Sequence, residues 1–141
     1  MSDEARERQV IEDVPKSLLI NGKARDATEG KTFDVEDPST GEILCQVADA
    51  SPEDGMAALD AAAAAQDAWA ATAPRERGEI LRKAFEIITE RADDIAMLMT
   101  LEMGKPLAES KAEISYAAEF FRWFAEEAVR ISGEWKVNAT G

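Results

Sequence analysis

Three aromatic side chains near the end of the chain stand at helical spacing, which makes them the first candidates for a binding surface. Tyr116, Phe120 and Trp123 follow one another at positions i, i+4 and i+7, so they share one face of an α-helix. Such a face either packs against another element of the same fold or, when it is exposed, marks a binding site. The spacing alone leaves both interpretations open.

Cys45 and Glu102 are two further side chains that could do chemistry. Cys45 is the single cysteine and has no neighbouring base, so we interpret it as a structural thiol. Glu102 falls on the apolar side when the preceding helical pattern is continued, and a carboxylate there needs a partner. Lys105 or nearby backbone N–H groups would serve, and a bound cation is the alternative.

Composition excludes several classes of site. The chain contains no histidine, the commonest acid–base residue and metal ligand at neutral pH, and no G-x-G-x-x-G, G-x-x-x-x-G-K-[ST] or C-x-x-C motif. A net charge of −13 argues against nucleic acid and against an anionic membrane surface as partners. Acidic solubility explains this charge, and a high-salt habitat is the alternative. We therefore expect no complete active site within these residues.

The first half of the chain must supply a scaffold of strands. Residues 1–16 predict an acidic, flexible arm without a secretory signal. Residues 18–47 predict a meander of three or four short strands, with turns at Asn21-Gly22 and at residues 38–41. Ser51-Pro52-Glu53-Asp54 then predicts a capped helix that runs to about residue 70.

The second half predicts the helices that position the aromatic face. Apolar residues recur at helical spacing after Pro74, with a possible joint near residues 91–93; they are Ile80, Leu81, Ala84, Phe85, Ile88, Ala92, Ile95 and Met99. Gly104-Lys105-Pro106 separates this stretch from a last helix that runs from residue 107 to about residue 131. Trp135 begins what reads as another strand. We therefore expect three or four helices after the strands, and no membrane-spanning segment.

Three blocks in order, LLINGK (18–23), DPSTGEIL (37–44) and LEMGKPLAESKAEISYAAEFFRWFAEEAVRISG (101–133), resemble the N-terminal part of the NAD(P)-dependent aldehyde dehydrogenase superfamily. The resemblance covers residues 17–137. Within the superfamily, these motifs are most similar to those of bacterial succinate-semialdehyde dehydrogenases of 4-aminobutyrate degradation. Enzymes acting on glutarate semialdehyde share similar motifs. It implies the α/β fold of that superfamily. Residues 17–141 would then be the N-terminal part of the cofactor-binding domain, ending at the start of an oligomerisation strand.

The resemblance also implies a reaction. In the family a cysteine thiolate attacks the aldehyde, hydride passes to NAD or NADP, and a glutamate-activated water hydrolyses the thioester. Those residues lie beyond residue 141 in the family, so we expect a fragment that has no catalytic or cofactor-binding residue and is inactive alone. The complete enzyme would be a cytoplasmic homodimer or homotetramer acting on a semialdehyde. The alternative is a non-catalytic helical protein-interaction module derived from the family.

Two sets of residues take specific roles from the resemblance. The family's helix after Gly-Lys-Pro forms part of the substrate entrance tunnel, which implies that Tyr116, Phe120 and Trp123 line that tunnel. Relatives also hold a structural cation near the end of the preceding helix. This implies a metal site at Glu102 and at the backbone carbonyl of Glu36.

Overall fold

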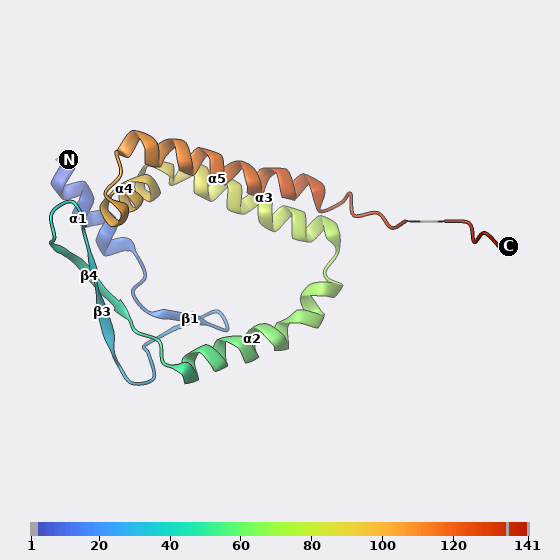
Figure 1. The fold of residues 1–141 in the computed structure, drawn as a ribbon, viewed down its shortest axis with the longest axis horizontal. Coiled ribbons are helices and arrows are strands. Elements are labelled where there is room, and N and C mark those ends of the chain that lie inside the picture. Colours follow the sequence, from blue (N-terminus) through green and yellow to red (C-terminus); the bar gives the residue numbers. More distant parts are fainter. Residues whose placement is uncertain (1–2, 135, 141) are drawn as a thin grey trace.

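The computed structural model describes residues 3–134 and 136–140. Figure 1 shows the elements, which are α1 (Asp3–Asp13), β1 (Leu18–Ile20), β2 (Lys23–Arg25), β3 (Thr32–Glu36), β4 (Ile43–Ala48), α2 (Pro52–Ala71), α3 (Pro74–Glu90), α4 (Ala92–Met103) and α5 (Leu107–Glu127). The α/β class and the helices expected after the strands are confirmed. No helix in this described part has the length and apolar character that crossing a bilayer requires.

The four strands form two separate antiparallel hairpins, β1–β2 and β3–β4. Asn21 and Gly22 both have positive φ, 53° and 70°, as a two-residue type I′ turn requires. The predicted strands and turns are therefore confirmed, but the prediction of one continuous meander is wrong. After β2 the chain turns toward α2 instead of pairing with β3, because Thr28 donates two hydrogen bonds to Asp54.

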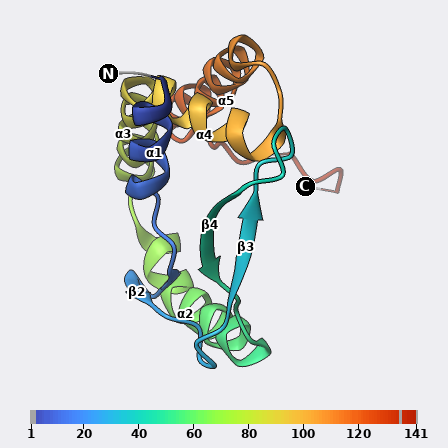
Figure 2. The same cartoon turned by 90° about the vertical axis from the view of Figure 1, so that its left-hand side faces the viewer.

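Residues 3–13 form a docked helix, so the prediction of a flexible arm is wrong for them. In both views α1 lies beside α4 (Figure 1 and Figure 2). Val10 is buried in a small core with Met97 and Leu101, and Arg6 donates to Asp94 across 3.1 Å. A single buried apolar position in a strongly polar helix leaves little periodic signal, which is why composition suggested an arm.

Helices α3 and α5 run in opposite directions side by side and form the most extensive contact between two elements among the described residues (Figure 1). Gly78 on α3 faces the backbone of Ala125 on α5, and a Cβ atom at Gly78 would lie 2.7 Å from the Ala125 carbonyl oxygen. A glycine here lets the two helices approach more closely than any other residue would allow. This pair therefore presents the remaining faces of α5 on a rigid support.

The predicted joint between α3 and α4 is confirmed at Arg91, whose φ of −99° and ψ of 14° interrupt the helix. Because the interruption changes the helical phase, α4 buries Ala96, Met97 and Leu101. Glu102 is exposed, so its predicted place on the apolar side is wrong. Gly104, with φ of 71°, ends the helix.

Helix α5 ends at Glu127 rather than near residue 131 as predicted. The next residues form a turn in which the backbone N–H of Arg130 donates to the carbonyl of Glu127. The β-branched residues Val129 and Ile131 disfavour further helix. Residues 128–134 and 136–140 contain no strand, and the predicted strand start at Trp135 lies outside the described residues.

Candidate functional site

The aromatic face of α5 is exposed and forms a shallow depression. The rings of Tyr116 and Phe120 meet edge to face, with centroids 5.0 Å apart and planes at 88°, an arrangement that aromatic pairs favour. Tyr116 is 67% exposed and Trp123 is 63% exposed. With Glu119 and Phe124 they line a hollow of about 350 Å³. The structure thus brings the three predicted residues together, and no described element packs over them.

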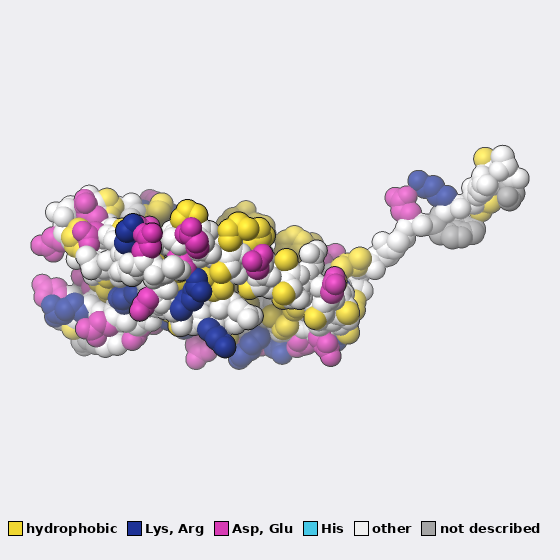
Figure 3. Space-filling view, turned by 90° about the horizontal axis from the view of Figure 1, so that it is seen from below, with side chains coloured by type: hydrophobic (Ala, Val, Ile, Leu, Met, Phe, Trp, Pro, Cys, Tyr) yellow, Lys and Arg dark blue, Asp and Glu magenta, His cyan; other side chains and the backbone are white. Residues whose placement is uncertain are grey.

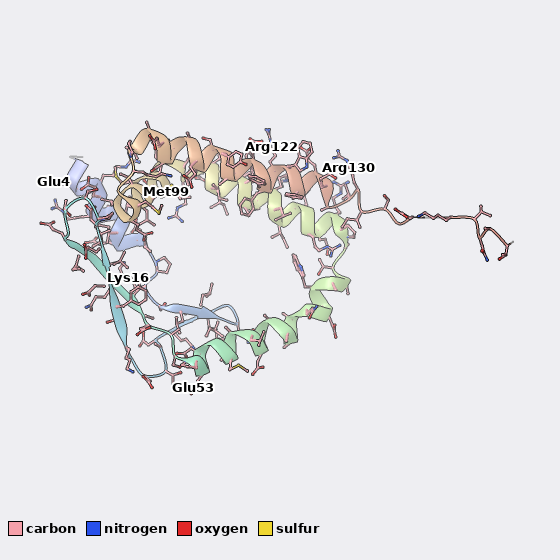
Figure 4. All side chains as sticks on the ribbon, viewed as in Figure 1. Glu4, Lys16, Glu53, Met99, Arg122 and Arg130 are labelled. Atoms are coloured by element: carbon pink, nitrogen blue, oxygen red, sulfur yellow. The ribbon has the colours of Figure 1, made fainter. Side chains whose placement is uncertain are left out.

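One ion pair stands at the edge of this depression. Glu119, the single charged residue among the described residues that line it, forms an ion pair with Arg122, with 2.6 Å between nitrogen and oxygen. The guanidinium carbon of Arg122 lies 5.6 Å from the centre of the Phe85 ring on α3, within the range of a cation–π contact. Figure 4 shows Arg122 in the second half of α5, toward Arg130. The depression is therefore lined by aromatic rings, and the one carboxylate at its edge is neutralised by Arg122.

A second and larger apolar hollow, of about 660 Å³, lies between the end of α2 and the α3–α5 pair. It is lined by Trp69, Arg77, Ile80, Leu81, Phe124, Glu127, Ala128, Arg130, Ile131 and Ser132. Figure 3 shows hydrophobic side chains gathered toward the end of the molecule from which the C-terminal segment leaves. Trp69, Ile80 and Ile131 are 49%, 54% and 77% exposed. These three apolar side chains are therefore uncovered around a single hollow.

Cys45 lies half-buried on β4, opposite Val35 in the β3–β4 register. Among the described residues no base is hydrogen-bonded to its thiol. A nucleophilic cysteine needs an activating base or positive charge close by. The geometry at Cys45 therefore supports a structural thiol.

Glu102 and Glu36 are both exposed. Of the two kinds of partner predicted for Glu102, Lys105 or backbone N–H groups, Lys105 is wrong, because it pairs with Glu113 on α5 instead. The ends of β3 and α4 do adjoin, since a Cβ atom at Gly104 would lie 3.1 Å from Cγ of Pro38. Within residues 3–134 and 136–140 no group of three or more acidic, cysteine or histidine side chains is arranged to hold a metal ion. The cation site stays a prediction.

Asp54 is a buried carboxylate that sequence reasoning did not single out. It is 1% exposed and accepts from Arg25, from the hydroxyl and backbone N–H of Thr28 at 2.7 and 3.0 Å, and from the hydroxyl and backbone N–H of Ser51 at 3.1 and 3.0 Å. The hydrogen bonds from Thr28, and then those from Ser51, hold the pKa of Asp54 well below its usual range.

The Ser-x-x-Asp spacing at the start of α2 was the available signal for Asp54. It predicts the capping box that the structure contains, in which Ser51 and Asp54 exchange hydrogen bonds. The contacts with Arg25 and Thr28 depend on the path of the chain after β2, which the spacing does not encode. Asp54 joins the first hairpin to α2, and its role is structural.

Most of the chain is similar in sequence to known proteins. The model of the aldehyde dehydrogenase family matches residues 25–140. A succinate-semialdehyde dehydrogenase of Paenarthrobacter nicotinovorans is 57% identical over 99 residues, which are 70% of this chain and 22% of that protein. The succinate-semialdehyde dehydrogenase [NADP(+)] GabD of Escherichia coli K12 is 51% identical over 119 residues, 84% of this chain and 25% of that protein.

A solved structure agrees in fold. The crystal structure of an NADP-dependent enzyme of E. coli superposes with a TM-score of 0.85 at 48% identity, over 88% of this chain and 26% of that one. The chain thus spans about a quarter of the length of the relatives it matches. The arrangement of helices and hairpins described above is that of the corresponding quarter.

Proposed function

Because the chain belongs to the aldehyde dehydrogenase family, we propose that it is the N-terminal part of an NAD(P)-dependent enzyme that oxidises succinate semialdehyde, or a similar semialdehyde, to the carboxylate. The observation that carries this proposal is the identity of 57% and 51% with two proteins named for that substrate. Glutarate semialdehyde is the neighbouring substrate to test.

In this proposal the aromatic face of α5 is one wall of the passage by which the aldehyde reaches the reacting centre. Tyr116, Phe120 and Trp123 offer ring faces and edges that contact the methylene groups of a short aliphatic substrate and exclude water from them. Their exposure supports this role, since a wall must be open on the side that the substrate passes. Their part is to position and select the substrate.

The residues present do not form a dinucleotide site by themselves. The sequence has no glycine-rich turn of the G-x-G-x-x-G kind, and no strand of the described part runs into a helix through such a turn. NAD or NADP, bound elsewhere in the complete enzyme, would accept the hydride from the substrate carbon. This chain's proposed share is the tunnel wall and its scaffold.

The chain alone is therefore proposed to be inactive. Its sole cysteine, Cys45, is half-buried in a hairpin, and the sequence has no histidine to serve as a base. The same proposal includes a structural cation near Glu102 and Glu36. It also includes assembly of the complete enzyme as a homodimer or homotetramer. A cytoplasmic location is proposed as well, because a single unpaired cysteine is compatible with a reducing compartment.

The experiment is a steady-state assay of the complete enzyme with succinate semialdehyde, glutarate semialdehyde and butanal, each with NAD+ and with NADP+. We expect kcat/KM for succinate semialdehyde to be the highest of the three with the preferred coenzyme. A higher value for glutarate semialdehyde would reassign the substrate, and no oxidation of any aldehyde would reject the proposal.

The exposure of Tyr116 and Trp123 also favours one second candidate, a non-catalytic module whose aromatic face binds a protein partner. Substitution within this face separates the two candidates. In an enzyme, changes at Phe120 alter kinetic constants for aldehydes. In an interaction module, the same changes weaken a protein complex, and there is no aldehyde oxidation for them to affect.

A further inference from the structure

We propose that Arg122 is a specificity-determining residue, which pairs with Glu119 and so lets an aldehyde that carries its own carboxylate pass along the aromatic wall. This inference rests on the proposed function, because it assigns a substrate charge to the same site. It concerns the edge of the depression rather than the aromatic rings themselves.

The position of Glu119 makes its charge relevant to the wall. Glu119 follows Tyr116 by three positions and precedes Trp123 by four, so it lies on the same side of α5 as both rings. It lines the depression together with them. A ligand that occupies this depression therefore lies beside Glu119.

An unpaired carboxylate at this place would oppose an anionic substrate. A semialdehyde of a dicarboxylic acid is an anion at pH 7, because carboxyl groups of this kind titrate near pH 4. Two like charges at such separations repel, and the repulsion grows as water is excluded from the passage. A neutral aldehyde of the same length would experience no such repulsion.

Arg122 cancels this charge from a fixed position. Its guanidinium lies 2.6 Å from the Glu119 carboxylate and also lies over the ring of Phe85 on the neighbouring helix. The second contact holds the cation between α3 and the aromatic wall even while the side chain is half-exposed. Arg122 is therefore anchored by α3 as well as by its ion pair.

The other acids next to the aromatic face follow the same rule. Glu113, one turn before Tyr116, pairs with Lys105, and Glu127, one turn after Trp123, pairs with Arg130. Figure 4 shows Arg130 just beyond the end of α5. Glu126 instead lines the hollow between α3 and α5, which Arg122 also lines, and it is not among the residues that line the depression. Of the bases in these three pairs, Arg122 neutralises the acid that lines the depression.

The test uses the complete enzyme and two four-carbon substrates, the anion succinate semialdehyde and the neutral butanal. For Arg122→Gln we expect kcat/KM for succinate semialdehyde to fall roughly three- to ten-fold, mainly through KM, as an unscreened like charge near the passage implies. The value for butanal should stay within about two-fold. Glu119→Gln should raise kcat/KM for the anion. The double variant, with both Arg122→Gln and Glu119→Gln, should have a ratio of kcat/KM for the two substrates close to that of the unsubstituted enzyme.

Two variants control for charge and for folding. Glu126→Gln removes one carboxylate from the same helix but not from the depression, and Arg82→Gln removes one exposed, paired guanidinium from α3. Both variants should leave the ratio of kcat/KM for succinate semialdehyde to kcat/KM for butanal unchanged. Arg122→Lys keeps the charge and should restore most of the preference for the anion. The effect of Arg122→Gln should also shrink in about 0.5 M salt, where exposed charges are screened.

Equal losses for both substrates in Arg122→Gln would overturn the inference, because they would indicate a structural role. An unchanged ratio of the kcat/KM values for the two substrates in Arg122→Gln would overturn the inference as well. Should Arg122→Gln not fold, Glu119→Gln decides, and no rise for the anion relative to butanal counts against the inference. Absence of turnover in the unsubstituted enzyme would reject the proposed function first, and this inference with it.

Discussion

A Cβ atom placed on Gly78 would lie 2.7 Å from the carbonyl oxygen of Ala125, so the backbones of α3 and α5 are in direct contact at this point. Real Cβ atoms do not approach a carbonyl oxygen so closely, and the partner atom belongs to helical backbone that cannot simply rotate away. The contact brings Arg122 within reach of Phe85 and holds the aromatic face of α5 outward. The candidate site depends on this close approach.

Gly78→Ala should therefore destabilise the fold even though alanine favours helix. Alanine gains roughly 1 kcal/mol over glycine in a helix interior, but forcing α3 and α5 apart costs about 1–3 kcal/mol. We expect the second effect to dominate and the urea midpoint of unfolding to fall. Circular dichroism in urea measures this.

Gly55→Ala is the matched control for Gly78→Ala. Gly55 is also helical, in α2, but a Cβ atom there would meet nothing within 4 Å. Its replacement should raise stability by about 0.5–1 kcal/mol, since it only restricts the unfolded chain and favours helix. Equal effects of the two substitutions would show that Gly78 does not set the spacing of the helices.

Asp54→Asn should lower the urea midpoint more than Asp60→Asn on the same helix. Asp54 is buried and accepts hydrogen bonds from Arg25, Thr28 and Ser51, whereas Asp60 is exposed. The amide has one acceptor oxygen in place of two and leaves Arg25 without its counter-charge. Equal shifts for the two variants would contradict the role of Asp54 as a joint between the first hairpin and α2.

The contribution of Asp54 should also depend on pH. Hydrogen bonds from Thr28 and Ser51 lower its pKa in the folded state, so the unfolded chain binds this proton more readily than the folded chain does. The stabilisation is therefore complete above the ordinary aspartate pKa of about 3.9 and declines as the pH falls below that value toward the folded pKa. The difference in midpoint between wild type and Asp54→Asn should be larger at pH 7 than at pH 3.

Val10→Ala should loosen α1 from α4. Val10 is 7% exposed and shares its core with Met97 and Leu101, so removing two methyl groups should cost about 1–2 kcal/mol. Hydrogen exchange should accelerate at the α1 amides. Arg8→Ala, at an exposed position of α1, serves as the control. Unchanged exchange in Val10→Ala would indicate that α1 does not depend on this core.

Phe120→Ala should impair use of the substrate without unfolding the protein. Loss of a ring that is 47% exposed and meets Tyr116 edge to face removes contact with the aliphatic part of the aldehyde, and we expect kcat/KM of the complete enzyme to fall about ten-fold. Phe33→Ala, at an exposed position of β3, makes the same change away from the depression. A similar loss in both variants would contradict the tunnel role.

Local patterns made the elements and the aromatic face predictable. Asn21-Gly22 specifies its own turn, Ser51-Pro52 starts α2, and the i, i+4, i+7 spacing is enough to gather Tyr116, Phe120 and Trp123 on one side of α5. These features depend on residues within one or two turns of each other. They are encoded before any tertiary contact forms.

The features that could not be predicted depend on distant partners or on accumulated phase. Arg6 on α1 contacts Asp94, 88 positions further along the chain, so the docking of α1 left no local signal. Glu102 was misplaced because one irregular residue, Arg91, resets the helical phase. The contact of Arg122 with Phe85 depends on the crossing of α3 and α5, which a helical wheel of either one does not contain.

The most direct measurement is the rate of reduced nicotinamide formation from succinate semialdehyde, for residues 1–141 alone and for the complete polypeptide that contains them. We predict turnover by the complete polypeptide and none by residues 1–141 alone at equal molar concentration. Turnover by residues 1–141 alone, or no turnover by the complete polypeptide with either coenzyme, would contradict the proposal that this chain is the tunnel-bearing part of a semialdehyde dehydrogenase.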